Sequence, residues 1–328
     1  MRLYTSKALL INSKGVKMKK FLFSIGTIML SVVLVFSVFA QQGGEFNKIP
    51  HGINPHSKSP NFPGFALTTG GTRKVSALSY HGGPLMTGTP HIYLIWYGNW
   101  NQGNGTDNAA GQQLVRDWAT GIGGTPYFNL NNTLSVSGKT ITGLVTYQGQ
   151  ATDSGNSDLS DSGVLAVVDR NVGTGKALPY DSNGVYFVVT SSNINETSGF
   201  CTQYCGWHTS GTISAGHVKY SFIGNAARCI TSCAAQSKSP NGNAGIDGAV
   251  SVLSHELEEA VTDPDLNAWY DSRGYENADK CAWTFGHAQY QSNGAWANMN
   301  FGGHDWLIQR NIFKTGSSYY CMVNSTQN

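Results

Sequence analysis

Short apolar runs rich in aromatic and β-branched residues alternate with polar, glycine-containing stretches along the middle of the chain. The run HIYLIWYGNW at 91–100 lies between turn-forming residues and predicts a buried strand. The segments 139–149, 184–192 and 217–224 have the same character and predict further strands. The segment 163–173, GVLAVVDRNVG, is compatible with either a strand or a helix.

Helical spacing appears in 111–122, where apolar residues recur three and four positions apart: Leu114, Val115, Trp118 and Ile122. This pattern predicts an amphipathic helix among the strands. The mixture predicts an α/β or α+β fold, a single globular domain with a mixed central sheet. The C-terminal half is rich in glycine and contains all the cysteines, so we expect disulfides to stabilise it.

A second helix is expected from about residue 248 to 261, and it is the helix that carries the candidate chemistry. Asp247 is a suitable N-cap, and no proline interrupts the run that follows. The helix must end near Thr262, because Pro264 disfavours helical backbone at Asp263.

The N-terminal region predicts export. Three residues, Met18-Lys19-Lys20, precede an apolar run at 21–40 that ends in the small-residue cleavage pattern Val38-Phe39-Ala40. We therefore expect a signal peptide at 18–40, preceded at 1–17 by an upstream extension or a misassigned start. The alternative is a retained membrane anchor, for which the run is about long enough. A flexible lead-in is expected at 41–75 and one globular domain at 76–328.

Composition narrows the possible partners. Removing residues 1–40 takes away six basic residues and no acidic one, which leaves 15 basic and 19 acidic residues in the mature chain. A mildly acidic protein gives no electrostatic reason to expect nucleic acid or an anionic membrane as a partner.

The six cysteines are expected to form disulfides in an exported chain, with the pairing open: Cys201, Cys205, Cys229, Cys233, Cys281 and Cys321. The first four also have spacing compatible with a four-thiolate zinc site.

The second helix carries His255 and Glu259, four residues apart, so that both side chains project from one face. This is the spacing that two metal ligands on one helix require. Glu256 lies to their side, where a general base accepts a proton. Downstream, Glu276 and Asp279 are the candidates for the third ligand that a catalytic zinc needs. The cofactor predicted is a divalent metal, with zinc the first choice, although two carboxylates beside one imidazole also suit manganese or calcium.

Alternative interpretations remain for these acidic residues. The helix carboxylates are also compatible with an ordinary solvated face. A calcium loop starting at Asp263 is disfavoured, because Ala268 and Gly274 occupy positions that need glycine and glutamate. Asp263 and Asp265 are then expected to be turn residues that bond local amides. Four further histidines are scattered along the sequence, and any one of them is a candidate to replace an expected metal ligand: His208, His217, His287 and His304.

The helix resembles that of gluzincin metallopeptidases, in which a His-Glu-x-x-His helix is followed by a glutamate ligand; here Glu259 replaces the second histidine. The resemblance implies that Glu276 is the third ligand and that Asp279 is an outer residue that orients a histidine ligand. A broader resemblance covers about Val75 to Cys321. LSYHGGPLMTG at 78–88, the following IYLIWYGNW, YSFIGNAARC and GIDGAVSVL resemble the EXORDIUM or phosphate-induced protein 1 family, here as a bacterial-type secreted member. That resemblance implies an extracellular protein linked to growth and to the cell wall or carbon signalling.

The sequence departs from the plant pattern of that family, which has small and apolar residues at the positions of His255, Glu256 and Glu259. Two functions are therefore expected. The first is a secreted, metallopeptidase-like hydrolase acting on a peptide or cell-wall polymer. The second is a non-catalytic extracellular binding or signalling protein in which the same residues hold a structural ion or none.

Overall fold

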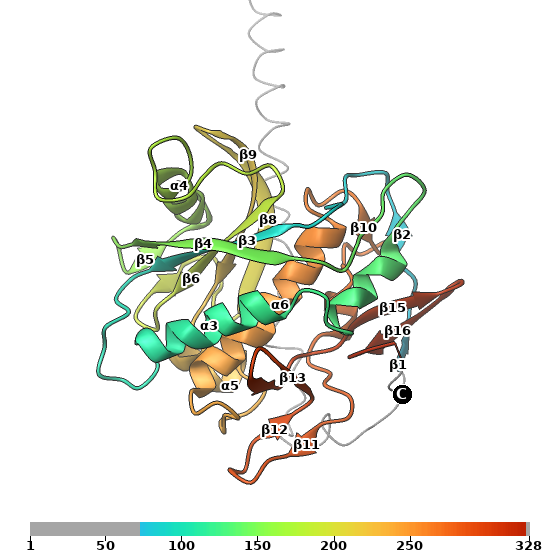
Figure 1. Cartoon of the computed structure of the whole chain (residues 1–328). Helices are drawn as coiled ribbons and strands as arrows, with labels where there is room; N and C mark the ends of the chain where they lie inside the picture. Colours follow the sequence, from blue (N-terminus) through green and yellow to red (C-terminus); the bar gives the residue numbers. More distant parts are fainter. Residues whose placement is uncertain (1–72, 326–328) are drawn as a thin grey trace, which may run out of the picture. The chain divides into compact units, whose positions relative to one another are not determined.

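A five-stranded mixed sheet forms the centre of the part of the chain that the computed structural model describes, residues 73–325 (Figure 1). In spatial order its strands are β4 (Thr146–Asp153), β3 (His91–Tyr97), β6 (Gly184–Thr190), β9 (Gly216–Ile223) and β8 (Gly206–Ile213). Only β8 runs antiparallel to its neighbour. Every residue of β6 is buried, which explains its continuous apolar run. The predicted fold class is confirmed.

Helices cover the sheet and connect its parallel strands. They are α3 (Ala109–Gly121), α4 (Asp161–Asn171), the short α5 (Ile230–Cys233) and α6 (Ala244–Thr262). α3 leads from β3 to β4, and α4 then leads past β3 to β6. Because right-handed crossovers in opposite directions place their helices on opposite faces, α3 and α4 cover different faces. α6 contacts α3 and packs on β8 and β9 (Figure 1).

Trp118 joins α3 to both the sheet and α6. Its ring meets Phe187 of β6 edge to face at 6.3 Å, and its Nε1 donates a hydrogen bond of 2.9 Å to Ser254 Oγ in α6. The indole is fully buried, so this hydrogen bond also satisfies its polar atom. The contact fixes the position of α6 one residue before His255.

A second sheet is formed by segments from both ends of the described chain: β1 (Arg73–Val75), β16 (Ser318–Met322) and β15 (Asn311–Thr315). The expected lead-in therefore already contributes a strand at 73–75. The remaining short strands are β2 (Ser79–Tyr80), β5 (Asp158–Leu159), β7 (Asn195–Glu196), β10 (Trp269–Tyr270), β11 (Gln289–Tyr290), β12 (Trp296–Ala297), β13 (Met299–Phe301) and β14 (His304–Trp306). The 3₁₀ turns are η2 (Phe128–Leu134), η3 (Ala226–Cys229) and η4 (Asp279–Cys281). The predicted signal peptide at 18–40 lies outside the described residues.

The strands expected at 91–100, 184–192 and 217–224 are confirmed, and the ambiguous segment 163–173 is largely helical, in α4. The strand expected at 139–149 begins only at Thr146, because Gly143 has a φ of 69° and interrupts the extended backbone. β8 was not predicted. Its polar sequence, GWHTSGTI, lacks the apolar run on which the other strand assignments depend.

The second helix ends as predicted, but the expected N-cap is wrong. Asn243 caps α6 by accepting a hydrogen bond from the Ile246 backbone, so the helix begins four residues before Gly248. Asp247 instead accepts hydrogen bonds from Ser239 and Asn241. Every residue of α6 from Gly245 to Thr262 is buried. The interpretation of its carboxylates as a solvated face is therefore wrong.

All six cysteines form disulfides: Cys201–Cys229, Cys205–Cys233 and Cys281–Cys321. The four-thiolate zinc interpretation is wrong, because its sulfurs are bonded to one another. Within residues 73–325, none of the helices has the length and apolar character needed to cross a bilayer.

The disulfides differ in how much of the chain each alone constrains. Cys281–Cys321 closes a loop of 40 residues that no other disulfide spans, whereas the other two close overlapping loops of 28 residues each. The double variant Cys281→Ser/Cys321→Ser should therefore lower the free energy of unfolding by about 2–4 kcal/mol. Cys201→Ser/Cys229→Ser should lose less, because Cys205–Cys233 still closes nearly the same loop. Urea unfolding of both variants tests this, and equal losses would contradict it.

Candidate metal centre

Three separate segments bring acidic and imidazole side chains together beside α6. His255, Glu256 and Glu259 come from the helix itself, and His208 comes from β8. The segment 276–279 follows the helix by way of a turn and folds back onto it. The ionisable side chains of this cluster are at most 5% exposed: His208, His255, Glu256, Glu259, Glu276 and Asp279.

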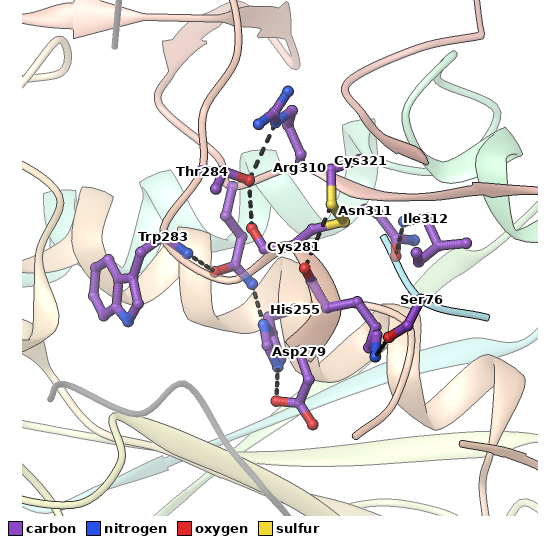
Figure 2. Close-up of a disulfide and its surroundings, with 12 residues drawn as sticks. Ser76, His255, Asp279, Cys281, Trp283, Thr284, Arg310, Asn311, Ile312 and Cys321 are labelled. Carbon is purple, nitrogen blue, oxygen red and sulfur yellow. Dashed lines mark hydrogen bonds and ion pairs between the residues drawn. A yellow bond between two sulfur atoms is a disulfide. The ribbon is translucent and has the colours of Figure 1, made fainter. Parts of the chain in front are cut away.

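The first group within the cluster consists of His255, Glu259 and Asp279. His255 Nε2 lies 2.9 Å from Glu259 Oε1 and 3.5 Å from Asp279 Oδ1. Figure 2 shows the imidazole of His255 pointing towards the Asp279 carboxylate. The Asp279 backbone N–H also donates a 3.0 Å hydrogen bond to Glu259 Oε1, which ties the returning segment to the helix.

The second group consists of His208, Glu256 and Glu259. His208 Nδ1 lies 3.5 Å from Glu256 Oε2 and 3.5 Å from Glu259 Oε2. On the other side of the ring, Nε2 lies 3.4 Å from the Asp263 backbone oxygen and 3.6 Å from Glu276 Oε1. A backbone carbonyl at one ring nitrogen favours the proton there, which leaves the Nδ1 lone pair free to bind a cation.

Many of the cluster's polar atoms have no hydrogen-bond partner although they are fully buried. They are His208 Nδ1, His255 Nε2, both carboxylate oxygens of Glu256, Glu259 Oε2 and Glu276 Oε1. The two imidazole atoms among them have ion-pair contacts of 2.9–3.5 Å with carboxylate oxygens. Leaving a buried polar atom unsatisfied costs about 1–3 kcal/mol, and more for a charged group. Imidazole and carboxylate atoms that face one another in this way are a set of donors that could hold a cation.

Residues around His255 hold its ring in place. The Gln309 side-chain amide contacts His255 Nδ1, so that Nε2 faces the carboxylates. A cation at Nε2 requires a proton on Nδ1. When the Gln309 amide is flipped, so that its oxygen instead of its nitrogen faces Nδ1, that oxygen accepts a hydrogen bond from the protonated Nδ1. The Cys281–Cys321 disulfide lies next to this group and fixes the end of the returning segment (Figure 2).

Glu258 is also buried in α6 but belongs to a different environment. Asn131 and Asn311 both donate hydrogen bonds to its Oε2, the latter at 2.7 Å. Asn277, between the two acidic residues of the returning segment, donates to the Glu258 backbone oxygen at 3.3 Å. Burial raises the pKa of Glu258 well above its usual range, even though the two asparagines favour the charged form. Glu258 is therefore held by asparagine side chains, outside the two groups of candidate ligands.

The electrostatics of the cluster follow from burial and crowding. Burial lowers the pKa of His255, but the negative charge of Glu259 and the hydrogen bond to Asp279 outweigh it and raise that pKa well above its ordinary value. Burial together with the charge of Glu259 raises the pKa of Asp279 to about 7. Burial likewise raises the pKa of Glu276 well above its usual range. Burial raises the pKa of Glu259, but the charges of His255 and His208 outweigh it and lower that pKa to about 2.

The residues present fit a divalent metal ion. Each of the two groups offers one imidazole nitrogen and two carboxylate oxygens, and within each group the three atoms lie within 4.8 Å of one another. Imidazole and carboxylate are ligands suited to zinc, manganese and iron. The donors converge from two elements and a turn, so the fold itself assembles the site.

In the structure, the segment 276–279 folds back over the helix, and its two acidic residues lie in each other's expected places. Asp279, not Glu276, lies against His255 and Glu259. Glu276 lies beside His208 instead. The reason is local: η4 begins at Asp279 and turns its side chain towards the helix, while the Glu276 backbone N–H donates to Asp279 Oδ2 at 3.2 Å.

His208 is the residue that sequence reasoning did not single out. It was one of four scattered histidines, and the strand that presents it was not predicted. The other three lie outside the cluster; His217 pairs with Asp265 at 2.8 Å and His304 with Asp117 at 2.9 Å. Asp263 acts as the predicted turn residue, accepting from the backbone N–H groups of Asn267 and Ala268 at 2.6 Å.

Comparison with known proteins gives one consistent result. The family described as "Phosphate-induced protein 1 conserved region" matches residues 78–300, a span that includes every residue of the cluster. Protein EXORDIUM-like 3 of Arabidopsis thaliana is 28% identical over 250 residues, which cover 66% of this chain and 72% of that protein. Protein EXORDIUM-like 5 of the same plant is 28% identical over 287 residues, 73% of this chain and 76% of that protein. No solved structure gives a significant match.

Metal binding at the cluster should stabilise the fold. Chelator-treated protein should gain about 2.7 kcal/mol when Zn²⁺ or Mn²⁺ is added at 100 times its dissociation constant, because the ion binds the folded chain. His255→Gln should reduce this gain, whereas His217→Gln, which changes a histidine outside the cluster, should preserve it. Thermal unfolding with and without metal measures both. An equal gain in His255→Gln and wild type would rule out His255 as a ligand.

Proposed function

The chain belongs to the phosphate-induced protein 1 family, and on that premise we propose that it is an extracellular protein with a divalent-metal centre built around α6. The observation that carries the proposal is the buried cluster, whose unpartnered imidazole and carboxylate atoms face one another. Export is supported by the signal-peptide pattern at 18–40 and by three disulfides, which are typical of oxidising compartments.

The burial of the cluster favours a structural role for the ion. Metal sites that only hold a fold together are closed by protein ligands, whereas catalytic sites keep one position open to substrate. Here the ligand side chains are at most 5% exposed, and they come from β8, α6 and the returning segment. An ion would cross-link these three segments. This supports the non-catalytic alternative, an extracellular binding or signalling protein.

A second candidate function, peptidase-like hydrolysis, rests on Glu256. Both of its oxygens are unpartnered, and they lie in the same cluster as the candidate ligands His255 and Glu259. A bound zinc ion would supply Lewis acidity to polarise a peptide carbonyl. Glu256 would accept the proton of the attacking water and pass it to the leaving amine, as a general base and then acid. Substrate would have to reach residues that are buried in this structure.

Protein secreted from the full-length gene in a bacterial or yeast host tests the first proposal. Intact mass spectrometry should give a mature chain that begins at Gln41, because the cleavage pattern ends at Ala40. Elemental analysis of the same protein, never exposed to chelator, should find a divalent metal in stoichiometric amount. A mature chain that begins at Met1 or Met18 would overturn the signal peptide, and absence of bound metal would overturn the metal centre.

Glu256→Gln tests the hydrolase candidate, with Glu258→Gln as the matched control on the same buried helix. If Glu256 is the general base, its variant should retain metal and hydrolyse an unstructured protein substrate about 10²–10⁴-fold more slowly, whereas the control should keep its activity. The assay follows peptide release with zinc-loaded protein. Full activity in Glu256→Gln with metal bound would remove the base role, and no hydrolysis by the wild type would leave the non-catalytic function.

A further inference from the structure

Glu259 is shared by the two donor groups of the cluster. His255, Glu259 and Asp279 form one group, and His208, Glu256 and Glu259 form the other. The two oxygens of Glu259 face different imidazoles: Oε1 lies 2.9 Å from His255 Nε2, and Oε2 lies 3.5 Å from His208 Nδ1. A carboxylate in this position can bind one cation through each oxygen.

We propose that the cluster is a dinuclear metal centre in which Glu259 bridges two divalent cations. His255 and Asp279 hold the first cation, and His208 and Glu256 hold the second. The inference rests on the proposed metal centre and deepens it. It also gives Glu256 a ligand role in place of the general-base role that the hydrolase candidate requires.

The unpartnered atoms favour two cations over one. An ion at the His255 group alone would leave His208 Nδ1, Glu259 Oε2 and both Glu256 oxygens buried without a hydrogen bond, with only the 3.5 Å contacts between His208 and the two glutamates. Ligand atoms on opposite sides of one zinc-sized ion are only about 4.4 Å apart, since each bond is about 2.2 Å. Within the described residues the donors form two compact groups that share Glu259, and in each group the three atoms lie within 4.8 Å of one another. Donors divided in this way favour two ions.

The charge of the cluster also favours two cations over one. Glu256, Glu259 and Asp279 supply carboxylates as ligands, and Glu276 adds a fourth one beside His208. Metal ligands are deprotonated when bound, so the three ligand carboxylates and two neutral imidazoles carry three negative charges. One divalent cation would leave one of these charges unbalanced in a buried site, which is costly. Two divalent cations would exceed the ligand charge by one, which ionised Glu276 beside His208 would balance.

The donor chemistry is known for paired metals. Di-iron and di-manganese carboxylate proteins with bundle folds combine four glutamates with two histidines on facing helices. Here the same six groups come from a strand, a helix and a returning segment, with one aspartate in place of a glutamate. Such a mixed set of oxygen and nitrogen ligands suits manganese, iron or zinc. Two-metal sites place their ions about 3.5–4 Å apart, a separation that one bridging carboxylate spans.

The number of ions per chain tests the proposal directly. Mature protein is stripped with chelator, reloaded with Mn²⁺ or Zn²⁺ and passed through a desalting column before elemental analysis. We expect two ions per chain. In the Mn²⁺ protein, electron paramagnetic resonance should show a spin-coupled pair instead of the six-line signal of an isolated ion, because the ions share Glu259.

Two variants each remove one ligand from one of the two donor groups. His208→Gln and Asp279→Asn should each retain one ion per chain and restore the six-line Mn²⁺ signal, whereas His217→Gln should keep two coupled ions. The wild-type measurement stands even if a variant fails to fold. One ion per wild-type chain would overturn the dinuclear centre and leave the proposed metal function intact. Two uncoupled ions would overturn the Glu259 bridge, and no retained ion would overturn both proposals.

Discussion

Ionisable groups in a protein interior must be paired or neutralised, and this constraint governs the part of the structure around α6. The helix is buried along nearly its whole length and yet carries four adjacent or nearby ionisable residues: His255, Glu256, Glu258 and Glu259. An apolar core would not tolerate them without partners. The neighbouring elements are accordingly polar where they meet the helix, with His208 on β8 and Asn131, Asn277 and Gln309 on turns and loops.

The constraint is met in two different ways on the two sides of the helix. Glu258 accepts hydrogen bonds from Asn131 and Asn311 through Oε2, and burial raises its pKa, although its Oε1 has no hydrogen-bond partner. The groups around Glu259 have too many carboxylates and too few donors for that solution. This contrast, within one turn of one helix, is why the proposed metal centre includes Glu256 and Glu259 and leaves Glu258 out. The Cys281–Cys321 bond then holds the returning segment in the place where it completes the cluster.

The central sheet and the cluster are linked through the same helix. Trp118 connects α3 to β6 and to Ser254, next to His255, so packing in the core sets the position of the ligands. β8, the antiparallel edge strand, presents His208 to the face on which α6 lies. If ions join β8, α6 and the segment 276–279, they act as cross-links between these three segments.

The sequence by itself determined the elements whose signals are local. Apolar runs predicted the buried strands β3, β6 and β9, and helical spacing predicted α3. The four-residue separation of His255 and Glu259 placed both on one face, because that relation depends only on helix geometry. Tertiary structure alone decided the remaining parts of the cluster. His208 lies on a polar strand with no sequence signal, and the choice between Glu276 and Asp279 depends on the turn at η4. Disulfide pairing and these ligand contacts join residues distant in the chain, and their proximity follows from packing that local patterns do not encode.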